Sequence, residues 1–324
     1  MVTLEELGFP GPAPDDGRRP ARVASVHAVR VDVWTTAGPV QASLRSRFLR
    51  IDGGVAVGDF VLLGATEDVV EEVLPRRTVF LRQAAGDRSE PQAIAANVDR
   101  VFVVTSAEDW NLRRLERYLV AIATGGAEAQ IVLSKSDLGA DVETTDALAP
   151  SLVTSAKTGA GLDELRARIP RGMTVAFVGS SGVGKSALVN VLLGRDAQLE
   201  GAVRAHDGRG RHTTTRRELF AVPGGGLLID TPGMRELKPW LPGGEVDDAF
   251  DDVASHAARC RYRDCAHESE PGCAVREAVA AGDLAPERLE AWRKLARERS
   301  TQVDKSKQRT ATLALRKRLR EKGN

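Results

Sequence analysis

The stretch Gly179-Ser180-Ser181-Gly182-Val183-Gly184-Lys185-Ser186 decides the fold in the middle of this 324-residue chain. It matches the phosphate loop G-x-x-x-x-G-K-S, and an apolar strand is predicted over 174–178, directly before it. Glycines let backbone N–H groups turn towards phosphate oxygens, and the N-terminus of the helix that follows attracts negative charge. We therefore expect the loop and Ala187 to bind a nucleoside triphosphate, with Lys185 at the β- and γ-phosphates and Ser186 at Mg²⁺.

Two further segments downstream of this loop suit a triphosphate site. Asp230-Thr231-Pro232-Gly233 ends a strand predicted over 227–229, where Asp230 can bind the Mg²⁺ shell and the Gly233 N–H can contact a γ-phosphate. Thr213-Thr214-Thr215 lies between the two motifs, where a first switch is expected. We place Thr214 at Mg²⁺, although the sequence does not distinguish it from its two neighbours. A β-prone polar stretch without this role is the alternative.

The residue that positions the attacking water is a separate question. Met234 follows Gly233, and a thioether cannot orient water as the glutamine of many GTPases does. His212, directly before the threonines, is the nearest candidate in sequence, and a loop histidine without a catalytic role is the alternative. We expect slow intrinsic turnover that a partner accelerates by ordering this loop.

Two upstream motifs indicate that the base is guanine. Ser134-Lys135-Ser136-Asp137 follows a strand predicted over 129–133, and the carboxylate of Asp137 can accept hydrogen bonds from guanine N1–H and N2–H₂ while the stem of Lys135 covers the base. Ser155-Ala156-Lys157 follows the next predicted strand and offers backbone N–H groups to the guanine carbonyl. The motifs therefore predict GTP and GDP as ligands.

The order of these motifs is unusual. In the usual GTPase the phosphate loop comes first and the guanine motifs come last, whereas here both guanine motifs precede residue 179. Each motif still ends a predicted strand, so the same site can close. The order predicts a circularly permuted GTPase domain whose old ends are joined through 169–173.

Patterns along the chain predict several domains. Short β-rich runs at 23–26, 29–34, 60–63 and 69–74, with turn signals such as Gly38-Pro39 between them, are typical of a small barrel. Apolar strands that alternate with helices indicate an α/β domain with a mainly parallel sheet. We expect a flexible leader over 1–20, a barrel over 21–90, the permuted P-loop GTPase domain over 91–242 and an α-helical zinc-binding domain with a basic tail over 243–324. The expected sheet strands are 100–105, 129–133, 152–154, 174–178 and 227–229.

All three cysteines lie close together near the C-terminal end. With one histidine they form a C-x4-C-x-H-x5-C group, and three thiolates with an imidazole are the ligand set of a closed structural zinc site. We expect one zinc ion that stabilises folding, and chance crowding or a redox cluster is the alternative. The predicted ligands are Cys260, Cys265, His267 and Cys273.

Charge and aromatic residues suggest a polyanionic partner. The formal net charge is only +1, but residues 293–324 carry twelve Lys/Arg against three acids, which favours RNA binding, with a merely solvated tail as the alternative. In the barrel, stacking and phosphate-binding groups occur together, and core placement of both aromatics is the alternative. We see no signal peptide or membrane span and expect a cytoplasmic protein. The tail residues are Lys305, Lys307, Arg309, Arg316, Lys317, Arg318 and Arg320, and the barrel residues are Trp34, Arg45, Arg47, Phe48 and Arg50.

The chain from residue 22 to 324 resembles the circularly permuted GTPases of ribosome assembly, in particular the small-ribosomal-subunit biogenesis GTPase (RsgA) family. The phosphate loop, Gly210-Arg211-His212-Thr213-Thr214-Thr215, the Asp230 motif and the cysteine cluster carry this resemblance. It implies an oligonucleotide-binding (OB) barrel, a zinc domain, a catalytic role for His212, and a monomer that binds rRNA and is stimulated by the small ribosomal subunit. One departure is Ser134, where the family more often has Asn.

Two other function classes compete with this reading. A metabolic P-loop kinase is opposed by Asp137 and the Ser155 motif, and preferential binding of GDP over ADP would decide between them. An RNA-binding module with a vestigial nucleotide site is opposed by intact Lys185, Ser186 and Asp230, and measurable turnover would exclude it.

Overall fold

The computed structural model consists of two compact units. The first unit comprises Met1–Arg82, Gln92–Asn111 and Gly125–Leu237, and the second comprises Gln83–Pro91, Leu112–Thr124 and Lys238–Asn324. The structure describes residues 2–48, 54–83, 91–139, 151–194, 218–230 and 250–300, the last range without 287, 291, 295, 298 and 299.

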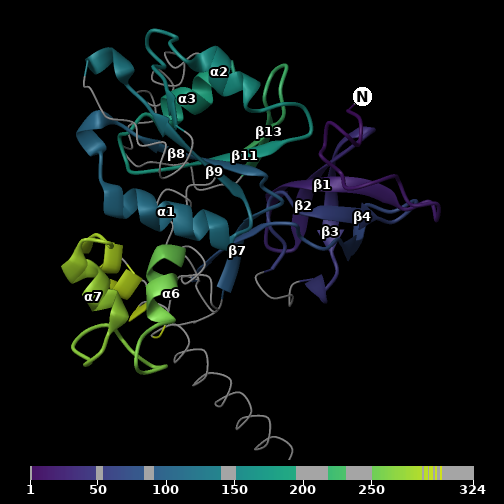
Figure 1. Ribbon diagram of the computed structural model, residues 1–324. Helices are drawn as coiled ribbons and strands as arrows, with labels where there is room; N and C mark the ends of the chain where they lie inside the picture. The colour runs from purple at the N-terminus through teal and green to yellow at the C-terminus, as the bar shows by residue number, and fades with distance from the viewer. Residues whose placement is uncertain are drawn as a thin grey trace, which may run out of the picture. The chain divides into compact units, whose positions relative to one another are not determined.

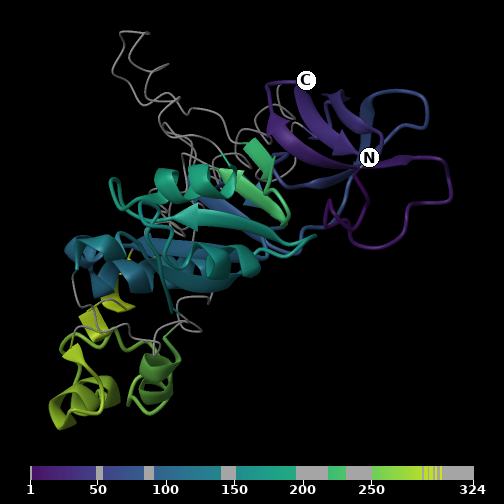
Figure 2. The ribbon, with the colours of Figure 1, turned by 90° about the horizontal axis from the view of Figure 1, so that it is seen from above.

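The first unit begins with a closed five-stranded barrel of the OB type, as expected (Figure 2). Alternating apolar residues point inward, so that Val31 and Val33 lie in the barrel core together with Val61. Its strands close in the order β1-β2-β3-β5-β4, with bounds β1 (Arg19–Val26), β2 (Arg30–Thr35), β3 (Gly38–Leu44), β4 (Phe60–Leu63) and β5 (Val69–Val73). Sequence reasoning missed β3 because Gly38-Pro39 reads as a turn, whereas Pro39 pairs with Trp34 inside the ladder.

The N-terminal segment, expected to be a flexible leader, packs against the barrel. The side chain of Leu7 is fully buried, and the rings of Phe9 and Phe60 meet edge to face with centroids 5.5 Å apart. The buried Arg22 guanidinium donates to the backbone oxygens of Leu7 at 2.7 Å and Asn97 at 3.0 Å, and its burial lowers its pKa to about 9. The leader is held in place because it supplies both apolar cover and a carbonyl acceptor for this desolvated cation.

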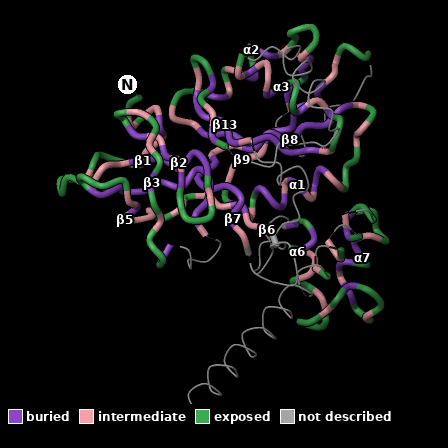
Figure 3. Tube along the Cα trace, turned by 180° about the vertical axis from the view of Figure 1, so that it is seen from behind, coloured by how far each residue is buried: buried purple, intermediate pink, exposed green. Residues whose placement is uncertain are grey.

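A six-stranded sheet forms the centre of the first unit, and all five strands expected from the sequence are present. Buried residues run along these strands in Figure 3, as expected for apolar parallel strands covered on both faces. Every neighbouring pair is parallel except β12 with β13. The order is β10-β9-β8-β11-β13-β12, with bounds β8 (Arg100–Thr105), β9 (Glu128–Leu133), β10 (Ser151–Val153), β11 (Thr174–Val178), β12 (Glu218–Ala221) and β13 (Leu227–Asp230).

Two helices cover one face of this sheet, α2 (Leu162–Ala167) and α3 (Lys185–Leu192) (Figure 1). Leu165 of α2 and Leu188 of α3 are fully buried in one apolar cluster with strand residues such as Phe177. The cluster fixes α3, and therefore the loop that precedes it, against the carboxyl end of β11.

The second unit contains three helices in the described ranges, α1 (Leu112–Thr124), α6 (Asp251–Ala257) and α7 (Ala274–Ala281), followed by helical residues between 286 and 300. We expected α1 to belong to the GTPase domain, because it connects β8 to β9. Its Val120 instead shares a core with Phe250 and Leu289. A short ladder of β6 (Val79–Gln83) with β7 (Pro91–Ala96) spans the boundary between the two units in sequence.

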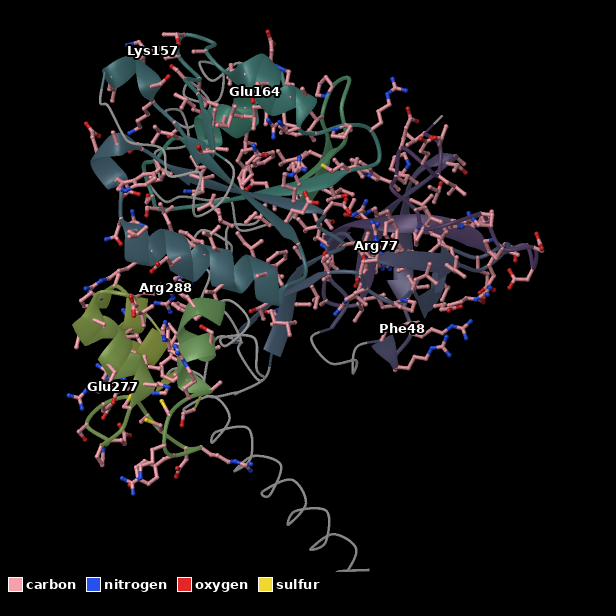
Figure 4. All side chains as sticks on the ribbon, in the orientation of Figure 1. Phe48, Arg77, Lys157, Glu164, Glu277 and Arg288 are labelled. Carbon is pink, nitrogen blue, oxygen red and sulfur yellow. The ribbon has the colours of Figure 1, made fainter. Side chains whose placement is uncertain are left out.

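Arg288, labelled in Figure 4, explains why α1 groups with the second unit. Its guanidinium donates to Asp252 on α6 at 2.7 Å and to Glu116 on α1 at 3.2 Å, and it lies 4.0 Å from the centre of the Phe250 ring. Burial raises the pKa of Glu116 even beside this cation. None of the helices in the described ranges combines the length and apolar character of a membrane span.

Candidate nucleotide site and metal centre

The phosphate loop connects β11 to α3, as the sequence predicts. Gly179 has φ +142°, and a Cβ there would lie 2.2 Å from the backbone oxygen of Val104. Gly182 and Gly184 also have positive φ, at +82° and +99°. Only glycine fits the first position, because the loop passes directly over the end of β8.

Lys185 and Ser186 lie in the first turn of α3. The buried ammonium of Lys185 donates to the backbone oxygen of Gly179 at 2.8 Å and to that of Ser180. It is therefore held at the mouth of the loop, where a phosphate can replace the carbonyl groups as its partner. Ser186 is exposed, as a hydroxyl that ligates Mg²⁺ must be.

The guanine motifs lie beside the phosphate loop. A Cβ at Gly184 would lie 3.5 Å from Ser134 Oγ and 4.0 Å from Lys135 Cγ, so these segments are in contact. Lys135 has φ +58°, a conformation that a lysine rarely adopts and that occurs mainly at functional turns. Residues far apart in sequence therefore meet at one edge of the sheet.

Ser134 occupies a buried bridging position. Its hydroxyl lies 2.9 Å from the backbone oxygen of Thr105 and also within hydrogen-bond distance of the backbone oxygen of Val183 in the phosphate loop. A serine hydroxyl has one proton to donate, so it satisfies one of these two acceptors at a time. An asparagine amide has two donor hydrogens and could bond both acceptors at once. The serine at position 134, where the family more often has asparagine, therefore provides one hydrogen bond fewer between these segments.

Asp137 and Ser155 join the two guanine motifs. The Ser155 hydroxyl donates to Asp137 Oδ1 at 2.7 Å, and this hydrogen bond is the main cause that lowers the pKa of Asp137. The same Ser155 oxygen accepts the backbone N–H groups of Lys157 at 3.3 Å and Thr158 at 3.2 Å. The turn therefore keeps Asp137 charged and ready to accept hydrogen bonds. The Lys157 side chain points outward and is 81% exposed (Figure 4).

The residues predicted for Mg²⁺ and catalysis are only partly described. Asp230 ends β13, which is paired with β11 in a register that matches Ala176 with Ile229, so it lies at the same sheet edge as the phosphate loop. His212, Thr213, Thr214, Thr215 and Gly233 lie outside the described residues, as do Arg50 and the basic tail from 305 onward.

The four predicted metal ligands come together in the second unit. Their ligand atoms all lie within 4.8 Å of one another. Cys273 Sγ is 3.9 Å from Cys260 Sγ and 3.4 Å from His267 Nδ1, and Cys260 Sγ is 3.5 Å from the same nitrogen. Ligands on a tetrahedral zinc ion are about 3.6–3.8 Å apart, given bonds of about 2.3 Å to sulfur and 2.0–2.1 Å to nitrogen. The cluster therefore fits zinc.

Sequence reasoning missed the residues that support this cluster. The Glu270 carboxylate accepts the backbone N–H groups of Ala266 at 2.9 Å and Glu268 at 2.8 Å. Backbone hydrogen bonds lower the pKa of Glu270 to about 2, and the largest contribution comes from the N–H of Glu270 itself. Trp292 lies against the His267 ring with centroids 4.9 Å apart. A glutamate inside a Gly- and Ser-containing turn is the one signal that could have indicated the first of these supports.

The barrel residues predicted for RNA separate into two groups. Phe48 is 8% exposed and belongs to the barrel core, as the alternative reading held, while Trp34 is half-buried. Arg45 and Arg47 are exposed, and the guanidinium of Arg47 lies 4.6 Å from the centre of the Phe48 ring. Arg45 also pairs with the Glu71 carboxylate at 3.4 Å, and Arg47 donates to the Glu71 backbone oxygen. Both arginines therefore lie at the surface, whereas Phe48 does not.

Known proteins match this arrangement over most of the chain. A family model described as RsgA GTPase matches residues 73–240. The chain is 43% identical over 325 residues to the small ribosomal subunit biogenesis GTPase RsgA of Streptomyces coelicolor, which covers 95% of this chain and 87% of the relative. It is 41% identical over 309 residues to the small ribosomal subunit biogenesis GTPase RsgA 2 of Lactiplantibacillus plantarum, and this alignment covers 91% of this chain and 87% of the relative. The chain belongs to the RsgA GTPase family.

Solved structures agree with membership in the RsgA family. The crystal structure of YjeQ from Thermotoga maritima aligns with a TM-score of 0.64 at 29% identity and covers 87% of this chain and 98% of that chain. The crystal structure of YloQ, described as a circularly permuted GTPase, aligns with a TM-score of 0.59 at 24% identity and covers 90% of this chain and 98% of that chain. At this identity the match shows a shared fold. The permuted order inferred from the motifs is thereby confirmed, and RsgA-family membership identifies the chain as a GTPase.

Proposed function

We propose that this protein hydrolyses GTP during biogenesis of the small ribosomal subunit, binds the subunit through its rRNA and is released when GTP is hydrolysed. The single observation that carries the proposal is the contact between the phosphate loop at Gly184 and the guanine motif at Ser134 and Lys135. This contact joins the triphosphate-binding and base-binding segments into one site in a chain of the RsgA family.

Each described site residue has a role that its position supports. Asp137 accepts the two guanine N–H donors, and the backbone N–H of Ala156 donates to the guanine carbonyl. The Ser155 N–H is bonded to the Ala160 oxygen at 2.9 Å and the Lys157 N–H to the Ser155 hydroxyl at 3.3 Å. Such a site discriminates against adenine, because adenine leaves the carboxylate without its donors. Selectivity for guanine favours a GTPase over a small-molecule kinase.

The phosphate end performs the chemistry. The buried ammonium of Lys185 stabilises the charge that develops on the transferred phosphoryl group, and α3 adds its N-terminal dipole. Mg²⁺ would be held by Ser186, Asp230 and Thr214, and when bound it neutralises charge on the β- and γ-phosphate oxygens. We keep His212 as the residue that positions the water.

The second unit supplies a fixed surface. We propose that its four ligands hold one zinc ion that stabilises the fold, because three sulfurs and one imidazole complete a tetrahedron and leave no position for substrate. The exposed Arg45 and Arg47 of the barrel supply another cationic surface for rRNA. We propose that the protein acts as a monomer in the cytoplasm, where the subunit is assembled.

GTP hydrolysis with and without purified ribosomal subunits tests this proposal. We expect small subunits to stimulate turnover and large subunits to leave it unchanged. Lys185→Ala should lower stimulated turnover about 10²- to 10³-fold, as removal of one transition-state donor does. Lys294→Ala, at an exposed lysine outside the nucleotide site, is the matched control. Equal stimulation by both subunits, or tighter binding of ADP than of GDP, would contradict the proposal.

A further inference from the structure

The segment around the first cysteine of the cluster, Cys260, exposes an unusual group of side chains. Residues 259–263 read Arg-Cys-Arg-Tyr-Arg, and the three arginines and the tyrosine are all exposed. We call this segment the arginine knuckle. Among exposed large apolar side chains in the described ranges, Tyr262 is the only aromatic one, and it is 42% exposed. The other tyrosine of the chain, Tyr118, is buried.

The backbone of the arginine knuckle is fixed at several points. Cys260 lies within it, Cys265 follows it by two residues, and both pack against the apolar core of the second unit. The Arg261 N–H donates to the backbone oxygen of Gly272 at 3.1 Å, and the Arg261 side chain lies close over Gly272, which has φ +73°. The exposed ring therefore stands on a rigid support, so little backbone entropy is lost when a ligand binds it.

The cations of the arginine knuckle are available for a ligand. Arg261 lies with its guanidinium 5.6 Å from the centre of the Tyr262 ring. Neither Arg261 nor Arg263 has a carboxylate within ion-pair distance in the part of the chain that the structure describes. The Nη2 of Arg259 lies 2.5 Å from His256 Nδ1. Three exposed cations and one exposed ring therefore occur within five residues.

This combination suits an unpaired nucleotide better than a peptide. Every base presents a π-face that can stack on tyrosine, and the phosphates on either side of it can bind the guanidinium groups. An acidic peptide would use the arginines but would leave the tyrosine ring without a partner.

We propose that the arginine knuckle binds single-stranded RNA, with an unpaired base stacked on Tyr262 and the adjacent phosphates bound by Arg261 and Arg263. The inference rests on the proposed function, because it places one contact with the small-subunit rRNA in the second unit. It adds a base-stacking site to an interaction otherwise attributed to charge.

The test compares full-length, zinc-loaded Tyr262→Ala and Tyr262→Phe with the unaltered protein. The probes are purified small subunits and a protein-free single-stranded RNA oligonucleotide of mixed sequence. Loss of one stacked base weakens binding about five- to 150-fold, and we expect this for the alanine variant with both probes. Phenylalanine keeps the ring and should bind within about twofold of the unaltered protein. Zinc content and GDP affinity, unchanged in both variants, verify the fold.

A second measurement concerns the phosphate contacts. Arg261→Gln with Arg263→Gln should flatten the dependence of log affinity on log salt concentration by about one to two, one for each phosphate released. Unchanged oligonucleotide binding by Tyr262→Ala, or an unchanged salt slope, would overturn the proposal. An effect of Tyr262→Ala on intact subunits alone would also overturn it and would indicate a protein partner. Failure of the unaltered protein to bind small subunits would contradict the proposed function, whereas the oligonucleotide still tests the arginine knuckle.

Discussion

The nucleotide site and the cysteine cluster are built in opposite ways. The nucleotide site draws on segments near residues 134, 155, 179 and 230, and much of its chemistry comes from backbone groups at the ends of four strands. The cysteine cluster draws its four ligands from residues 260–273, and all four ligand atoms belong to side chains. A dispersed site depends on the whole sheet, whereas a local one depends on its own ligands.

This difference teaches where each site is vulnerable. The phosphate loop tolerates little movement, because Gly179 passes against the end of β8 and Gly184 against the Ser134 motif. The cluster is supported by its own turn, through Glu270, and by the Trp292 ring. Variants that damage one site and spare the other are therefore a direct test of the comparison.

The largest effect should come from Cys273→Ser. Cys273 is one of the four proposed zinc ligands and is 3% exposed in the core of the second unit. Structural zinc contributes about 10–16 kcal/mol of apparent folding free energy in small zinc domains, so we expect loss of zinc and cooperative unfolding of the second unit. Metal analysis and thermal unfolding measure this.

Asp264→Asn, at an exposed position of the same loop, is the matched control for Cys273→Ser and should retain zinc. Because the cluster and the nucleotide site belong to different compact units and share no residue, GDP affinity of Cys273→Ser should stay within about tenfold of the unaltered protein. A Cys273→Ser protein with a full complement of zinc and an unchanged melting temperature would show that Cys273 neither binds zinc nor stabilises the second unit.

Gly179→Ala should damage the nucleotide site and spare the cluster. The added Cβ would lie 2.2 Å from the Val104 oxygen, so the loop must shift, and a displacement of about 1 Å costs about 10²-fold in turnover. Gly182→Ala is the control, because Gly182 also has positive φ but has no atom within 4 Å of the new Cβ. GDP affinity, turnover and zinc content are the measurements. Equal losses in the two variants would mean that backbone conformation, not the close approach to β8, limits this loop.

Ser155→Ala should produce the smallest effect, a change in the pH dependence of GDP affinity. The Ser155 hydroxyl is the main cause that holds the pKa of Asp137 below its ordinary value of 3.8. A lowered pKa means that the carboxylate is charged at neutral pH and that binding is lost as the pH falls through the folded-state pKa. Without the hydroxyl the pKa rises, so GDP affinity of the variant should begin to fall at a higher pH.

The control for Ser155→Ala is Thr158→Ala, in the same turn, which leaves the hydrogen bond to Asp137 intact. GDP affinity titrated from neutral pH to about pH 3 provides the comparison, because the pKa of Asp137 in the unaltered protein lies below 3.8. If Ser155→Ala and the unaltered protein had the same pH profile, the Ser155 hydroxyl would not control the pKa of Asp137. That result would contradict the view that the two guanine motifs act together.

Much of the fold follows from sequence patterns, and the failures have physical causes. The apolar runs at 100–105 and 174–178 form strands, because the strands of a parallel sheet that is buried on both faces favour short, continuous apolar sequence. Strand β3 was missed because Pro39 and Gly38 are turn residues by local propensity, which pairing with β2 overrides. Likewise, no local pattern in residues 1–20 predicts that the backbone oxygen of Leu7 will accept a hydrogen bond from the buried Arg22, 15 residues later.

The sequence by itself determined the identity of both sites, because the phosphate loop, the guanine motifs and the C-x4-C-x-H-x5-C spacing each require particular residue types at short range. It also determined the permuted order, since that order is a property of the chain. Only the tertiary structure decided which residues cooperate. It joined Ser134 to the phosphate loop, Ser155 to Asp137 and α1 to the second unit through Arg288. Those contacts link residues 18 to 172 positions apart, and local sequence patterns carry no information on which of several polar side chains will meet at such separations.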